Sequence, residues 1–153
     1  MLEEPLTQLS AQGTTSGTTK DFTGIPSWAK RITVLFAGVS TSGTSGLLVQ
    51  VGTSAGFATV GYTAGSFQQD ADLVVTTGFG VRIGAATDTV SGVMTITNVA
   101  GNTWASTHGC SRGFVSVAGG GHVALSGVLD RIRITTVNGT DTFDNGSVNI
   151  IYE

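Results

Sequence analysis

Short stretches rich in Val, Ile and Thr recur about every ten residues along most of this chain. Within them apolar residues alternate with polar or small ones, which is the period of a β-strand. Segments rich in Gly, Ser, Thr and Asn separate the stretches, and these residues favour tight turns. No stretch shows a convincing helical period. The pattern predicts an all-β protein, an antiparallel β-sandwich of the jelly-roll-like kind.

The strand at 31–39 is the clearest of those expected. Ile32, Val34 and Phe36 share one face, but Leu35 and Ala37 on the other face are apolar too. We therefore expect this strand to be buried on both faces, or on one face and in a subunit contact. The other expected strands are 47–52, 58–64, 71–76, 81–84, 92–99, 102–109, 113–120, 129–137 and 147–153.

Turn residues predict how several strands are joined. Ala100-Gly101 is expected to close a hairpin between 92–99 and 102–109. The polar segment 138–146 is expected to join the last two strands as a second hairpin. Gly119-Gly120-Gly121 is expected to be a flexible loop, because neither a Lys-Ser pair nor a helix start follows to build a phosphate site.

A chain of 153 residues fits one domain. We place a β-sandwich domain at 22–153 and a short extended N-terminal arm or linker at 1–21, because Ser, Thr, Gly and Gln dominate that segment. Leu2, Leu6 and Leu9 are candidate attachment residues that would dock on a partner protein. The alternative is a frayed terminus.

Charge and composition exclude some functions. Seven Lys and Arg against ten Asp and Glu give a formal net charge of −3, so we expect no nucleic acid partner. The acidic start lacks the basic region of a signal peptide, and no apolar run reaches membrane-spanning length. We expect synthesis in a cytoplasm and no membrane insertion. A charged fraction of only 11% favours self-association.

Catalytic and metal motifs are weak. Residues 52–56 match G-x-S-x-G, but strand-like residues 57–62 follow where a nucleophile elbow needs a helix, so we expect a hairpin turn. His108, Cys110 and His122 lack the spacing of zinc ligands, and His108 is expected in a turn. We therefore expect no catalytic residues, no metal and no cofactor.

Two arginines share one face of the strand at 129–137. Arg131 and Arg133 alternate with Ile132 and Ile134, so the two cations need carboxylates or solvent nearby. They lie on an exposed sheet face, or they pair across a subunit boundary, where we also place Tyr152. The candidate carboxylates are Asp130, Asp141 and Asp144.

Aromatic residues are the second place to look for a ligand. Trp28 is expected to cover the end of the core, with a ligand platform as the alternative. Tyr62 and Trp104 lie in strand-like sequence and are expected in the core, although loop aromatics would indicate sugar binding.

Two segments carry a family resemblance. FTGIPSWAKRITV at 22–34 and LDRIRITTVNGTDTFDNGSVNIIYE at 129–153 resemble the two ends of a module that recurs in virion proteins of tailed bacteriophages and prophages. Such modules form tail-fibre tips, and similar domains serve as head fibres or capsid decoration proteins. The resemblance implies an all-β, homotrimeric, non-enzymatic part of the virion surface.

From the resemblance we expect a non-enzymatic virion structural protein, either a trimeric capsid decoration or head-fibre protein or a short tail-attached protein. Its partners would be further copies of itself and a capsid, tail or baseplate protein bound through the N-terminal arm. The alternative is the receptor-binding tip of a tail fibre, which recognises a host surface glycan or protein.

Overall fold

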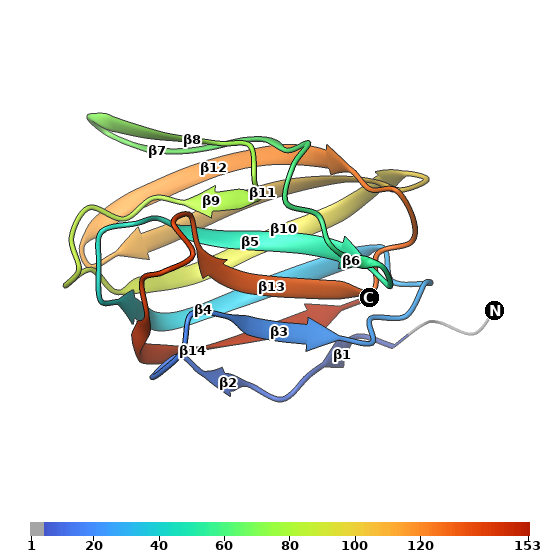
Figure 1. Cartoon of the computed structure of the whole chain (residues 1–153), viewed down its shortest axis with the longest axis horizontal. Coiled ribbons are helices and arrows are strands. Elements are labelled where there is room, and N and C mark those ends of the chain that lie inside the picture. The colour runs from blue at the N-terminus through green and yellow to red at the C-terminus, as the bar shows by residue number, and fades with distance from the viewer. Residues whose placement is uncertain (1–4) are drawn as a thin grey trace.

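Two antiparallel sheets pack face to face in the computed structural model, which describes residues 5–153 (Figure 1). The larger sheet contains β1 (Thr7–Gln8), β2 (Gln12–Gly13), β4 (Arg31–Thr41), β7 (Thr63–Gln68), β8 (Ala71–Val75), β10 (Val90–Ala100), β11 (Thr103–Arg112), β12 (Val115–Ala124) and β14 (Phe143–Tyr152). The smaller sheet contains β3 (Lys20–Thr23), β5 (Leu47–Thr53), β6 (Gly56–Phe57), β9 (Phe79–Val81) and β13 (Arg131–Thr136). The predicted antiparallel β-sandwich is confirmed.

The strand orders are simple. The larger sheet runs β1-β14-β4-β10-β11-β12-β7-β8, with β2 also paired to β14, and the smaller runs β3-β13-β5-β6, with β9 paired to β5.

Across residues 5–153 the structure contains no helix of the length and apolarity that a bilayer span requires.

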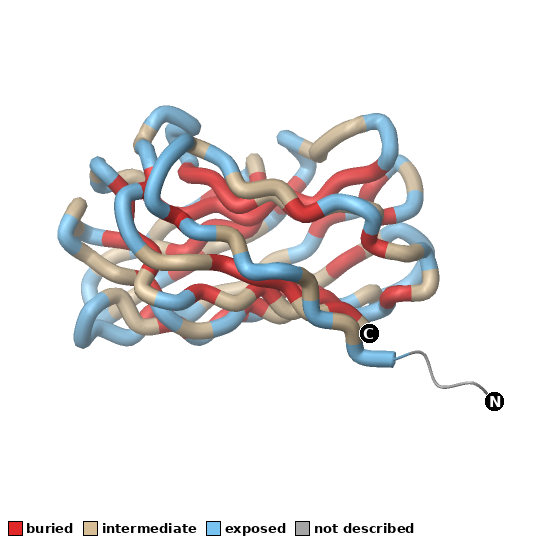
Figure 2. The backbone as a smooth tube through the Cα atoms, turned by 90° about the horizontal axis from the view of Figure 1, so that it is seen from below, coloured by how far each residue is buried: buried red, intermediate tan, exposed pale blue. Residues whose placement is uncertain are grey.

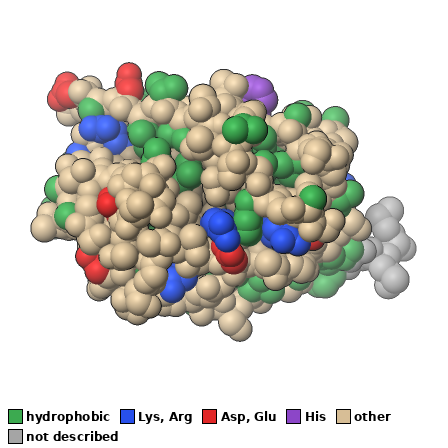
Figure 3. All heavy atoms as spheres, in the orientation of Figure 1, with side chains coloured by type: hydrophobic (Ala, Val, Ile, Leu, Met, Phe, Trp, Pro, Cys, Tyr) green, Lys and Arg blue, Asp and Glu red, His purple; other side chains and the backbone are tan. Residues whose placement is uncertain are grey.

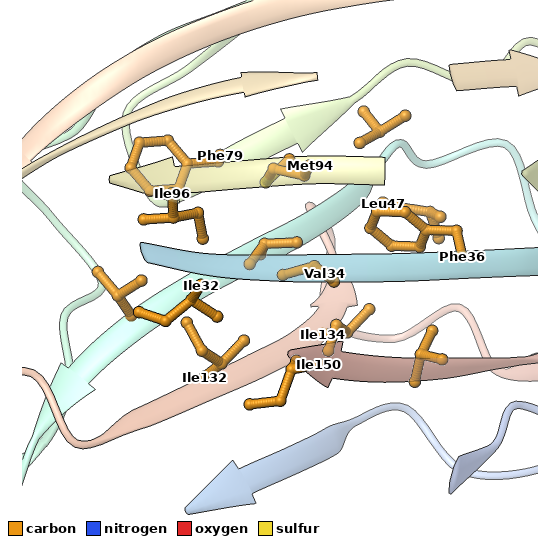
Figure 4. Packing of buried hydrophobic residues seen from close by; sticks show 14 of the residues in the cluster. Ile32, Val34, Phe36, Leu47, Phe79, Met94, Ile96, Ile132, Ile134 and Ile150 are labelled. Carbon is orange, nitrogen blue, oxygen red and sulfur yellow. The ribbon is translucent and has the colours of Figure 1, made fainter. Parts of the chain in front are cut away.

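The hydrophobic core lies between the sheets (Figure 4). Ile32 and Val34 of β4 are 0% exposed, and they face Ile132 and Ile134 of the smaller sheet across the core. Figure 2 shows the buried backbone in the middle of the molecule and the exposed residues mainly in the connections. The alternation read from the sequence therefore places one face of each main strand inside.

The other face of β4 is not buried within the chain, so the second predicted alternative, a subunit contact on this face, stays a prediction. Thr33 and Leu35 are half-buried there, and Ala37 is exposed. The arm covers β14 beside it and leaves the rest of this face of the sheet open.

The segment before β4 holds the end of β14. The main-chain N–H groups of Lys30 and Arg31 donate to the main-chain oxygen of Glu153 at 2.7 and 2.9 Å, and the Glu153 N–H donates to the Arg31 carbonyl at 3.0 Å. The Trp28 ring lies 5.6 Å from the Tyr152 ring, centroid to centroid, and packs against the core as predicted. We call residues 24–31 with 152–153 the terminal clasp.

The N-terminal arm follows the sandwich closely. Strands β1 and β2 pair with β14, and β3 pairs with β13, so the arm borders both sheets. Thr14 is fully buried, and its hydroxyl donates to the Asn145 carbonyl at 2.8 Å. These contacts join residues 7–23 to the sandwich on both sides of the predicted boundary at residue 21.

Strand pairing gives the sandwich two distinct ends. The Thr41↔Phe143, Leu47↔Val81 and Val90↔Arg112 pairs place the connections after β4, β9, β11 and β13 at one end, which we call the distal end. The terminal clasp and the first described residues lie at the other, proximal end (Figure 1).

One predicted hairpin is confirmed and one is wrong. Strands β10 and β11 form the expected hairpin, and Gly101 turns it with a φ of 52°. Strands β13 and β14 do not form a hairpin, because they belong to different sheets. Each of them carries a buried apolar face, so they stack across the core, and the segment 137–142 crosses between layers.

The prediction of a flexible loop at Gly119-Gly120-Gly121 is wrong. All three glycines lie within β12, between β11 and β7. A Cβ atom on Gly119 would lie 2.8 Å from Ser66 Cα and 2.6 Å from His108 Cε1. Glycine is needed there because the neighbouring groups occupy the space that a side chain would take.

This crowding gives a test. Gly119→Ala should lower the free energy of unfolding by about 1–3 kcal/mol, because backbone cannot move aside easily. Gly109→Ala on the adjacent strand should change it by less than about 1 kcal/mol, since no atom lies within 4 Å of a Cβ there. Urea denaturation followed by circular dichroism measures both, and equal losses would contradict the assignment.

Candidate functional site

The predicted attachment residues separate in the structure. Leu6 is 61% exposed, just before β1 at the proximal end. Leu9 packs against the core, and its N–H donates to the Ile150 carbonyl at 3.1 Å. Leu2 lies outside the described residues. Of the two candidate leucines within residues 5–153, Leu6 is therefore the one that is largely open to a partner. The attachment role stays a prediction.

The two arginines of β13 find carboxylates within the chain. Arg131 Nε lies 2.7 Å from Asp130 Oδ1, and Arg133 makes two hydrogen bonds of 2.8 Å to the Asp21 carboxylate. The Arg133 guanidinium also lies 4.3 Å from the centroid of the Phe57 ring. Hydrogen bonding to Asp21 raises the pKa of Arg133 above its ordinary value. Figure 3 shows basic side chains beside acidic ones near the middle of this face.

The other carboxylates suggested for this role lie elsewhere. Asp141 accepts the Ser45 N–H at 3.0 Å, and Asp144 accepts a hydrogen bond from Ser40. Tyr152 is 9% exposed and belongs to the terminal clasp. A subunit contact through Arg131, Arg133 and Tyr152 stays a prediction, although both arginines already have partners.

His108 lies in β11 and not in a turn, so that prediction is wrong. Its side chain points into the sandwich, where it is 5% exposed, and Nε2 lies 3.0 Å from Ser66 Oγ. Ser66 Oγ also accepts the Arg82 N–H at 3.0 Å, so its own proton is free for Nε2. Burial lowers the pKa of His108 to about 4, which keeps the ring neutral near pH 7.

The Ser66–His108 pair has two members of a nucleophilic triad but not its geometry. His108 Nδ1 is buried with no hydrogen-bond partner among the described residues. Ser66 is 2% exposed, so a substrate cannot reach its hydroxyl. This pair is therefore part of the packed interior.

Cys110 is buried beside this pair, and burial raises the pKa of its thiol to about 11. Within residues 5–153 no three His, Cys, Asp or Glu side chains are grouped to hold a metal ion.

Two other sequence predictions are confirmed. The G-x-S-x-G match forms the tight turn between β5 and β6, not a nucleophile elbow. Tyr62 and Trp104 are core residues, 3% and 4% exposed. The Tyr62 hydroxyl accepts the Val51 N–H at 3.0 Å.

Sequence reasoning missed a fully exposed aromatic residue. Phe114 occupies the turn between β11 and β12 at the distal end, with a relative exposure of 107%. Its neighbour Gly113 has a φ of 59°, which turns the chain at that point. The segment 113–120 was predicted as one strand, but Gly113 was the available sign of a turn.

The loops around Phe114 are held by one ion pair. Arg112 Nη1 lies 2.6 Å from Asp88 Oδ2, and both side chains are mostly buried. Burial alone would raise the pKa of Asp88, but hydrogen bonds from the Gly84 N–H, Arg112 and the Ala85 N–H lower it below its ordinary value. Arg112, two residues before Phe114, is therefore anchored to the loop that carries Asp88.

A shallow groove of about 590 Å³ lies on the outward side of β7, β8, β11 and β12. Gly65 and Gly120 form part of its floor, and Phe67, Val74 and Thr107 line its sides. Two of these apolar side chains are largely exposed: Phe67 at 58% and Val74 at 82%. The groove is mostly apolar and open to solvent.

Comparison of the chain with protein-family models, with curated proteins and with solved structures finds no match.

The buried histidine makes stability depend on pH. The unfolded chain takes up the His108 proton near pH 6.5, whereas the folded chain takes it up near pH 4. The contribution of His108 to the free energy of unfolding is therefore fully present above about pH 6.5. It falls by about 3 kcal/mol as the pH drops to about 4. Urea denaturation from pH 4 to 7 should show a smaller decline for His108→Gln than for the wild type, and parallel declines would contradict this assignment.

Proposed function

We propose that this chain is a non-enzymatic structural protein of a bacteriophage virion, a homotrimeric capsid decoration or head-fibre protein or a short tail-attached protein. Its proximal end faces the particle, and its distal end projects outward at the virion surface. The arm contacts a capsid, tail or baseplate protein.

The observation that carries this proposal is that the two segments with the bacteriophage resemblance pair with each other in both sheets. Residues 22–34 and 129–153 are far apart in sequence, but β3 pairs with β13, and β4 pairs with β14. The Ile25 N–H also donates to the Asp130 carbonyl at 2.9 Å. The two segments form one continuous unit, which is what two ends of a single inherited module should do.

The placement of the two ends of the sandwich also supports the proposed role as a surface part of the virion. Leu6 and the terminal clasp lie at the proximal end, and the connections after β4, β9, β11 and β13 lie at the distal end. A part that is anchored at one end and displays loops at the other needs this polarity.

Immunogold electron microscopy of the source phage tests the proposal. An antibody against residues 22–153 should label the head if the protein decorates the capsid or forms head fibres. Label at the tail supports the tail-attached form. Particles that carry no label, with the protein present in the lysate, would overturn the virion assignment.

The attachment role of the arm has its own prediction. Leu6→Ser should reduce occupancy of the particle while changing the free energy of unfolding by less than about 0.5 kcal/mol, because Leu6 is exposed. Occupancy is measured by adding purified protein to particles that lack it and quantifying what sediments with them. Val60→Ser, at 75% exposure, is the matched control. Equal occupancy for both variants would contradict attachment through Leu6.

Phe114 favours the second candidate function, the receptor-binding tip of a tail fibre. An exposed aromatic ring on a turn at the distal end can stack on a sugar ring or enter a pocket of a host protein. This function shares the fold and polarity of the first and differs in what the distal end contacts.

For this second function, Phe114→Ser should weaken binding of the labelled protein to host cells about tenfold or more, because exposed anchor residues dominate such contacts. Val128→Ser is the control, since Val128 is 56% exposed in the connection between β12 and β13, at the proximal end. Flow cytometry of host cells measures the binding. Unchanged binding by Phe114→Ser would exclude Phe114 as a receptor contact.

A further inference from the structure

The outward side of the larger sheet forms a broad surface over β4, β10, β11, β12, β7 and β8, which we call the open face. Strand register aligns its side chains in two main rows. These are Thr33, Thr95, Thr107, Gly120, Gly65 and Val74, and Leu35, Val93, Gly109, Ala118, Phe67 and Asp72. The arm borders this face along β14, where Asn149 Nδ2 donates to the Leu9 carbonyl at 2.8 Å.

Two glycines on the open face have no reason within the chain to be glycine. A Cβ on Gly109 would meet no atom within 4 Å, and one on Gly65 would make only an ordinary contact of 3.5 Å with the Leu73 carbonyl. Neither glycine has a positive φ. Glycine weakens a strand interior and is often found where another backbone or a ligand approaches closely. Their positions fit a surface that another backbone can approach closely.

The open face also exposes large apolar side chains. Val93 is 44% exposed, Phe67 58% and Val74 82%. Between these three side chains lie the small residues Gly65, Gly109, Ala118 and Gly120. The surface therefore lies close to the backbone in its middle, and large apolar side chains stand on either side. Contiguous exposed apolar surface of this kind marks a protein contact more often than free surface.

The distribution of charge on the open face favours a second copy of this chain as the partner. On the described strands of the open face the ionisable side chains are Arg31 and Asp72, at opposite margins, and His122. Around a common axis, side chains close to the axis meet their own copies, so a face without central charges avoids repulsion there. The small sheet differs, because its outward face carries the Arg133–Asp21 and Arg131–Asp130 pairs.

We propose that the open face is the surface through which copies of this chain associate, with the faces of three copies turned toward a common axis. The sheets would then pack over the glycine floor, where missing side chains let them approach, and Val93, Phe67 and Val74 would fill the space between them. This inference rests on the homotrimer of the proposed function and specifies its interface.

Analytical ultracentrifugation of purified full-length protein tests the interface. The wild type should sediment as a trimer. Val93→Lys and Gly109→Glu alter cross-strand neighbours on the open face, and each should raise the dissociation constant about a hundredfold because like charges meet near the axis. Val128→Lys is the control, because Val128 is 56% exposed in the connection before β13 and should leave the trimer intact. Circular dichroism confirms that each variant is folded.

The outcomes separate this inference from the virion assignment. Folded variants that both remain trimeric would move the interface elsewhere, for example to Arg131 and Arg133, and would leave the homotrimer standing. A wild-type monomer at micromolar concentration would overturn the inference. Labelling of the phage by immunogold would still decide the virion role in either case.

Discussion

The pairing of β4 with β14 is the interaction on which the rest of this structure depends. It joins residues 122 positions apart, since the Arg31 side chain meets the Glu153 carboxylate. The terminal clasp completes it, with main-chain hydrogen bonds between Lys30, Arg31 and Glu153. Strand β14 supports the arm on one side and β4 on the other, and β4 supports the β10–β11–β12 meander. This pairing closes a long loop, because more than a hundred residues separate β4 from β14. The larger sheet becomes continuous only after the entropy cost of that closure is met.

The Pro-x-Trp sequence before β4 follows from that pairing. Pro26 fixes the backbone where the chain enters the strand, and its carbonyl accepts the Ala29 N–H at 3.0 Å. The turn places the Trp28 ring against Tyr152, beside the end of the core. What appears in the sequence as an isolated aromatic residue is therefore one half of a contact whose other half lies at the far end of the chain.

The strands and turns that depend only on neighbouring residues could be predicted from the sequence. The open face could not, because it depends on how distant strands pair. Alternation along 31–39 and 92–109 indicates strands whatever their neighbours, and Gly101 indicates the hairpin. Alternation does not say which sheet a strand joins, so β13 and β14 were wrongly paired. A run of glycines such as the one at Gly119 also indicates a loop. The crowding that requires glycine there comes from Ser66 and His108, which reach it only in the folded chain. The open face was equally inaccessible, because Gly65 and Gly109 come onto one surface only through the register of β11, β12 and β7.

The contacts of the arm have a consequence for the handling of this protein. Strands β1 and β2 occupy hydrogen-bonding positions along the outer edge of β14, whereas β8 ends the sheet on the opposite side. A protease that removed the first twenty residues would uncover N–H and C=O groups of β14 and so lengthen the unpaired edge on this side of the sheet. Such an edge accepts strands from other molecules. The arm thus leaves two strands of two residues at this border of the sheet in place of a strand of ten.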